Sequence, residues 1–289
     1  MSRILAMCCA TALASAAFGQ TWVSGTGYDG NTCTRTSPCA TFQKAVSVTP
    51  SGGTLGVLDA GNYGPVVIQQ EITIDGGGLA TILTTTTASA IVIQAPTAAV
   101  RIRNLSLVSN SPSSTVGVNF TAGGQVILDN VKVSGFPYGV NVGLSGSGYA
   151  DLFIKNSSIS GATYGISISS SGPSITAEIS NTSLIGNYIG LTASVGRISL
   201  RDSTISSPAI VGSDIGIVAN GAYVMVDNCQ ITRYPIGILS SSIVQLNRST
   251  LSFNSTAVET QGSGVVVSLG TNSFFENGAN GSVTLGGLQ

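Results

Sequence analysis

A short motif that recurs along the chain constrains its fold more than any other feature. Residues 126–133, VILDNVKV, are its clearest copy: an apolar-x-apolar-x run ends in one polar residue, here called the anchor, and apolar residues follow. Successive anchors lie 20 to 26 residues apart, a period that predicts a solenoid of stacked β-strand coils. The clear anchors are Asn104, Asn130, Asn156, Asn181, Asp202 and Asn228, with weaker copies at Arg248 and Thr271.

The same pattern sets the expected domain organisation. Strand signals begin near Thr54, so we expect an all-β parallel β-helix over residues 51–289, with roughly ten or eleven coils. Residues 20–50 do not follow the repeat, and we expect them to cap the open end of the solenoid. Within them, Thr41 is suited to be the N-cap of a short helix that buries Phe42, Ala45 and Val46.

Composition and the N-terminal segment indicate an exported protein. Residues 1–19 combine one basic residue, an apolar run and small residues, which is typical of a signal peptide and too short for a membrane span. Cys33 and Cys39 flank a short loop, so we expect a disulfide bond between them, and Cys229 occupies an expected core position. Only 8% of the residues are charged and the net charge is -1, which disfavours a nucleic-acid partner. We therefore expect a secreted monomer without a transmembrane segment.

The anchors are expected to stack inside the solenoid. Side chains alternate across a strand, so Leu128 in the core predicts that Val126 and Asn130 also face inward. Repeated in every coil, this arrangement predicts a buried ladder of polar side chains that bond to the coils above and below. Its members are Asn104, Asn130, Asn156, Asn181, Asp202 and Asn228.

A column of alternating charge lies one residue before the anchors and is expected to face outward. Opposite charges one coil apart avoid repulsion between stacked strands, which favours a structural role. The alternative is a catalytic site, in which Lys155 or Arg201 acts as the base while Asp129 and Asp227 hold Ca²⁺. The column comprises Asp75, Arg103, Asp129, Lys155, Ser180, Arg201, Asp227 and Asn247.

Tyrosines also recur at about one per coil, at Tyr138, Tyr164, Tyr188 and Tyr234. Tyr138 and Tyr164 share the phase of inward Val140 and Ile166, which favours an internal aromatic stack. In the alternative hypothesis, the rings of Tyr138 and Tyr164 bind the sugars of a polysaccharide substrate.

The repeat, apolar-x-apolar-x-Asn-x-x-apolar followed by Tyr-Gly-apolar-x-apolar, resembles that of the pectin-lyase-like superfamily. This resemblance implies a right-handed, single-stranded parallel β-helix. Residues 22–46, WVSGTGYDGNTCTRTSPCATFQKAV, look like the opening of a group of small secreted bacterial β-helix proteins without a settled activity. The superfamily includes pectate lyases, polygalacturonases, tailspikes and adhesins, so the resemblance implies a fold more than a function.

Signatures of catalysis in similar proteins are missing from this sequence. There is no His and no adjacent acid pair for polygalacturonase-like chemistry, and Arg233-Tyr-Pro matches only a fragment of a pectate-lyase-like motif. We therefore expect an extracellular interaction or structural module, with a polysaccharide or cell-surface glycan as its partner and no metal or cofactor. The alternative is a polysaccharide lyase that uses Ca²⁺ and acts on an acidic glycan.

Overall fold

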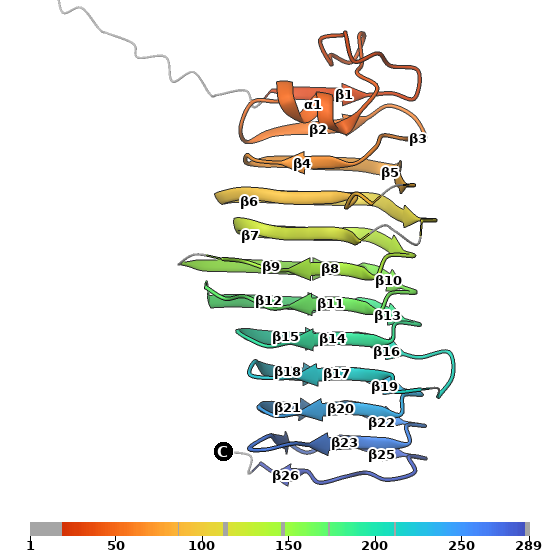
Figure 1. Ribbon diagram of the computed structural model, residues 1–289, viewed down its shortest axis with the longest axis vertical. Helices are drawn as coiled ribbons and strands as arrows, with labels where there is room; N and C mark the ends of the chain where they lie inside the picture. Colours follow the sequence, from red (N-terminus) through yellow and green to blue (C-terminus); the bar gives the residue numbers. More distant parts are fainter. Residues whose placement is uncertain are drawn as a thin grey trace, which may run out of the picture.

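The structure is a computed structural model that describes residues 19–85, 87–111, 115–145, 148–172, 174–210 and 212–286. These residues wind into a rod of stacked coils, with the strands perpendicular to the long axis (Figure 1). All pairings between named strands are parallel, which confirms the predicted all-β, right-handed parallel β-helix. The predicted signal peptide lies outside the described residues apart from residue 19.

Three sheets, here called faces A, B and C, run the length of the rod, and the chain visits them in that order in each coil. Three long strands bend around corners: β5 (Ile72–Thr84) serves faces A and B, and β6 (Ile91–Ser109) and β7 (Val116–Ser134) each serve faces C, A and B. Face A also contains β1 (Gln20–Val23), β2 (Gly53–Val57), β9 (Tyr149–Lys155), β12 (Ser174–Ser180), β15 (Arg197–Arg201), β18 (Tyr223–Asp227), β21 (Ile243–Asn247), β24 (Val265–Ser268) and β26 (Thr284–Leu285).

Faces B and C are built from shorter strands that follow those of face A. Face B contains β3 (Gly61–Asn62), β10 (Ser158–Ser160), β13 (Ser183–Ile185), β16 (Thr204–Ser206), β19 (Gln230–Thr232), β22 (Thr250–Ser252) and β25 (Ser273–Phe275). Face C contains β4 (Val66–Ile68), β8 (Tyr138–Val142), β11 (Tyr164–Ile168), β14 (Ile189–Ala193), β17 (Ile215–Ala219), β20 (Ile236–Ser240) and β23 (Thr256–Thr260).

The solenoid has about eight regular turns, and with the less regular ends included twelve of the described strands stack on face A, in line with the ten or eleven coils predicted. The prediction also counted the irregular turns at the two ends, where β3 and β26 are only two residues long. Inward Val, Ile and Leu side chains from the three faces form one continuous core. Within the described residues, no helix is long and apolar enough to cross a membrane.

A helix and a disulfide-closed loop lie at the N-terminal end of the rod. The helix α1 (Phe42–Val48) begins at Thr41, whose side chain accepts a hydrogen bond from the Lys44 backbone N–H, as predicted for an N-cap. Its apolar residues Phe42, Ala45 and Val46 are buried, also as predicted. Cys33 and Cys39 form the expected disulfide bond, and both are buried.

The anchors do not face inward, so that part of the prediction was wrong. Each of the six occupies the corner between faces A and B with a φ of 47° to 58°, the left-handed conformation that Asn and Asp tolerate best among residues with side chains. This corner interrupts the strand alternation and turns the side chain to the outside. Asn104 is half-buried, and the other five anchors, Asn130, Asn156, Asn181, Asp202 and Asn228, are exposed.

Anchor side chains still bond from coil to coil, but at the surface. Asn130 donates to Asn104 at 2.9 Å, Asn181 donates to Asn156 at 2.8 Å, and Asn228 donates to Asp202 at 2.6 Å. The buried polar row lies one residue later, where small hydroxyls accept backbone hydrogen bonds from the preceding coil. That row contains Ser157, Thr182, Ser203, Cys229 and Ser249. Burial raises the pKa of the Cys229 thiol to about 11, consistent with its predicted core position.

A column of glycines lets the coils approach closely on face C. A Cβ placed on Gly139, Gly165, Gly190 or Gly216 would lie 2.5–2.6 Å from the carbonyl oxygen of the next glycine in the column. Any larger residue would therefore force the coils apart, which explains the small residue that precedes each apolar run of this face.

Candidate functional site

The predicted charge column exists and lies in register on the outside of face A. Paired strands align Asp75 with Arg103, Arg103 with Asp129, and Asp129 with Lys155. Lys155 Nζ lies 3.2 Å from Asp129 Oδ2, and Arg103 Nε lies 2.9 Å from Asp75 Oδ2. Burial raises the pKa of Asp129, but hydrogen bonds from Asn156 and Lys155 outweigh it and hold that pKa below its usual value.

The four residues of the hypothetical lyase site are not brought together. Four strand spacings separate Asp129 from Asp227, about 19 Å, so the two carboxylates cannot share one Ca²⁺. Asp227 pairs instead with Arg248, whose Nη2 lies 2.6 Å from Asp227 Oδ2. Arg201 Nε donates to Ser199 Oγ at 2.9 Å. Nowhere in the described part of the chain do three or more His, Cys, Asp or Glu side chains form a group that could hold a metal ion.

The tyrosines do not form one internal stack, which corrects the second inward prediction. Tyr138 and Tyr164 stack with ring centroids 4.9 Å apart and planes at 11°, but both are only half-buried. Gly139 and Val140 are both buried, so the alternation breaks between them and leaves Tyr138 on the outside. Each ring covers one face of the other, so that face of each ring is closed to a sugar. Tyr188 is exposed and Tyr234 is fully buried.

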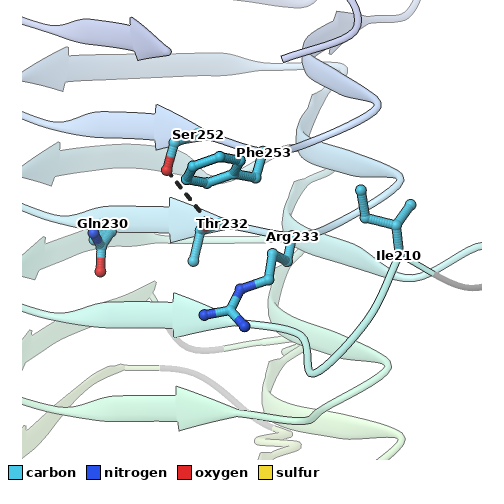
Figure 2. A pocket seen from close by; sticks show the side chains of 6 residues that line it. All are labelled: Ile210, Gln230, Thr232, Arg233, Ser252 and Phe253. Carbon is cyan, nitrogen blue, oxygen red and sulfur yellow. Dashed lines mark hydrogen bonds between the residues drawn. The ribbon is translucent and has the colours of Figure 1, made fainter. Parts of the chain in front are cut away.

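A hollow on face B, here called the face B groove, gathers side chains that could bind a ligand (Figure 2). Its volume is about 440 Å³, within the range of small-molecule sites. Thr232 and Ser252 end neighbouring strands and lie at its base, where Ser252 Oγ donates to Thr232 Oγ1 at 3.4 Å. The lining residues are Ile210, Gln230, Thr232, Arg233, Ser252 and Phe253.

The longest connection between faces B and C supplies one wall of the groove. Most coils join these faces through a short corner, such as residues 161–163, 186–188 or 253–255. Between β16 and β17 the connection is longer, and its described residues 207–210 and 212–214 project from the side of the rod (Figure 1). This segment carries Ile210, which is 48% exposed, to the edge of the groove (Figure 2).

Arg233 and Phe253 hold a backbone conformation that favours glycine. In earlier coils, the first residue of the corner between faces B and C is Gly135, Gly161 or Gly186, each with φ between 66° and 78°. In later coils the same corner holds Arg233 at φ 64°, Phe253 at φ 56° and, outside the groove, Glu276 at φ 50°. A left-handed residue with a side chain costs about 1–2 kcal/mol, and such strain often marks functional sites. The side chains of Arg233 and Phe253 are therefore retained at a conformational cost.

Arg233 is an exposed cation without an acidic partner among the described residues. The three salt bridges found there use Arg103, Lys155 and Arg248. Its guanidinium extends over the strand of the preceding coil, on the side away from Phe253, whereas the 44% exposed ring of Phe253 lies beside Ser252 (Figure 2). The groove thus combines a planar cation, an exposed amide and the exposed ring of Phe253, which also contacts Phe275 edge to face with ring centroids 5.8 Å apart. The two hydroxyls at its base are nearly buried and bond to each other.

Of the groove residues, only Arg233 stood out in the sequence, as part of a motif fragment, and no site was predicted there. Two signals point to them once the coils are aligned. The step from Asp202 to Asn228 is longer than its neighbours on either side, which marks the extra segment at residues 207–214. Arg233 and Phe253 stand where Gly135 and Gly161 stand in earlier coils.

No protein-family model matches the sequence, and no curated protein matches it. Among solved structures, the pectate lyase Pel9A is 16% identical with a TM-score of 0.54, and the match covers 92% of this chain and 72% of that chain. The GH136 lacto-N-biosidase from Eubacterium ramulus is 11% identical with a TM-score of 0.53, covering 89% of this chain and 65% of that chain. At these identities, the likeness to both enzymes shows a shared overall fold and nothing further.

Proposed function

We propose that this protein is an exported glycan-binding module and that the face B groove is its binding site. The observation that carries the proposal is the pairing of a strained, exposed Phe253 with hydrogen-bonding groups in one hollow. A sugar ring has an apolar C–H face that can cover an aromatic ring and hydroxyls that need donors and acceptors. The exposed amide of Gln230 supplies such a donor and acceptor, and the nearly buried hydroxyls of Thr232 and Ser252 lie at the base of the groove.

Two further observations agree with this function. The solved structures of similar fold are named as a pectate lyase and a lacto-N-biosidase, both of which act on carbohydrates. The Cys33–Cys39 disulfide and the signal-like residues 1–19 suit export to an oxidising compartment. A rigid rod with few charges can present the groove outside the cell.

Geometry gives no comparable support to the lyase alternative. Asp129 forms a salt bridge with Lys155, and Asp227 forms one with Arg248, so neither carboxylate is free to bind a metal ion. A proton-abstracting base and grouped carboxylates would be needed at one place, and face A spreads these groups over several coils.

Retention on immobilised glycans tests the proposal. The purified protein would be run by native electrophoresis through a series of gels, each containing one polysaccharide, and the series would include neutral and acidic polysaccharides. We expect at least one glycan to retard it, and Phe253→Gly to abolish the retardation, because this change removes the ring while allowing the same φ. Tyr28→Ala is the matched control, since Tyr28 is a 71% exposed aromatic residue in the N-terminal cap.

Either of two results would refute the site. The first is no retardation by any glycan, and the second is equal retardation of wild type and Phe253→Gly. Ultraviolet-absorbing unsaturated products formed from an acidic glycan in Ca²⁺, and lost in Lys155→Ala, would instead support the lyase.

A further inference from the structure

We infer that the face B groove selects an anionic saccharide, whose carboxylate or sulfate group binds Arg233 while a sugar ring covers Phe253. This inference rests on the proposed glycan-binding function and adds the charge of the ligand and its direction on the rod. It uses a face that the charge column does not occupy.

Arg233, like Arg101 and Arg197, is an exposed arginine that forms no salt bridge or side-chain hydrogen bond within the described structure, and of these three it is the one that lines the face B groove. Arg103 and Arg248 are bound by aspartates, Arg35 packs on the Trp22 ring at 4.7 Å, and Arg201 donates to Ser199. These four have partners within the protein. Arg233 has no such partner among the described residues and projects into the groove (Figure 2).

The chemistry of the Arg233 guanidinium indicates which ligand group it would bind. Its planar fork can donate two parallel hydrogen bonds to a carboxylate or a sulfate, which a neutral sugar hydroxyl cannot accept in the same way. The outward residues beside Arg233 on face B are Gln230, Thr232 and Ser252, none of which carries a charge. An anionic group on the ligand would therefore find a cation that no neighbouring lining residue neutralises.

The spacing of the corner residues sets the direction of the ligand. The Arg233 backbone N–H donates to the Ser252 carbonyl, so Arg233 and Phe253 belong to adjacent coils about 4.8 Å apart along the rod. A saccharide that contacts both must run along the rod axis across the strands. From the coil of Ile210 to that of Phe253 the groove spans three coils, so binding should stop strengthening at roughly three sugar rings.

The test uses alginate oligouronates as the carboxylate probe, the same oligomers after carboxyl reduction, and dextran sulfate against dextran. Calorimetric titration of the full protein should show binding of the oligouronates or of dextran sulfate, and no binding of the neutral counterpart. Whichever anion binds identifies the carboxylate or the sulfate as the recognised group. Affinity should fall at higher salt, since the contact is exposed.

Three variants separate site binding from general charge. Arg233→Gln should weaken anion binding by roughly tenfold or more, and Arg233→Lys should weaken it less, because the charge stays and the fork is lost. Lys132→Gln removes the same charge from face B outside the groove and should change the affinity less than about twofold.

The other possible outcomes would refute either the anionic selection or the role of Arg233. Equal binding of charged and neutral oligomers, still lost in Phe253→Gly, would leave glycan binding in place and refute the anionic selection. Equal loss in Lys132→Gln and Arg233→Gln would show unspecific charge attraction and refute the Arg233 site. Binding of none of the four probes by wild type would refute the anionic inference, and the retardation test on neutral glycans would then decide the proposed function separately.

Discussion

Arg233→Gly should stabilise the protein while removing its ligand cation. Arg233 holds a φ of 64° at a corner where Gly161 holds 66°, so glycine fits the same backbone. Relief of the left-handed conformation contributes about 1–2 kcal/mol, and the extra freedom of glycine in the unfolded chain takes back about 0.5–1 kcal/mol. The side chain is exposed and has no salt bridge in the described structure, so little packing energy is lost. The net expectation is a gain of about 0.5–1 kcal/mol.

Thermal and urea denaturation of wild type and Arg233→Gly would measure this gain, with hydrogen exchange at β19 and β22 to detect a local change. The matched reverse control is Gly161→Ala at the equivalent corner, where a Cβ has no atom closer than 4.0 Å. It should lose a similar amount, about 0.5–1 kcal/mol. If Arg233→Gly instead destabilised the protein by more than about 1 kcal/mol, Arg233 would be a structural residue, and its left-handed φ would not mark a functional site.

Three further predictions concern the fold. Gly135→Ala should cost more than Gly161→Ala, because its Cβ would collide with the Ser109 carbonyl oxygen; equal losses in melting temperature would contradict the geometry. Asn156→Ala should lower the free energy of unfolding by about 1 kcal/mol, and Asn156→Gly should lower it clearly less, because the left-handed φ of Asn156 matters more than its exposed hydrogen bonds. Equal losses in urea denaturation would mean that the hydrogen bonds matter more. Burial raises the pKa of Asp214 despite a hydrogen bond from Ser207, so the native state binds the proton more tightly than the unfolded state. Stability should therefore decline as the pH rises from about 4 through the folded pKa, and Asp214→Asn should remove that decline in a pH series of unfolding curves.

The fold could be predicted because the repeat encodes stacking directly. Aligning the anchors gives the strand register, and the outward column from Asp75 to Asn247 pairs residue for residue as the alignment implies. Thr41 directly precedes an apolar segment with helical spacing, and this position likewise predicts Thr41 as the N-cap of α1.

Side-chain direction at the corners could not be predicted from strand parity. Alternation assumes a continuous strand, whereas Asn130 sits at a left-handed corner and Tyr138 follows another corner. Each corner resets the phase, so Asn130 and Tyr138 point outward although Leu128 and Val140 point inward.

The face B groove could not be predicted from the sequence for a related reason. Its lining comes from Ile210, from β19 and β22, and from the corner residues that follow these two strands, and no single coil contains the whole set. Thr232 and Ser252 become the base of a site only after the side chains of Arg233 and Phe253 lie over the same face. A sequence pattern gives the register of these coils but not the hollow between their side chains.

The most direct test is a crystal structure of the protein soaked with whichever anionic oligosaccharide binds most tightly. We expect the saccharide on face B, running along the rod axis with a ring against Phe253 and its carboxylate or sulfate within hydrogen-bond distance of the Arg233 guanidinium. A saccharide bound instead on face A, across Lys155 and Arg201, would contradict the account.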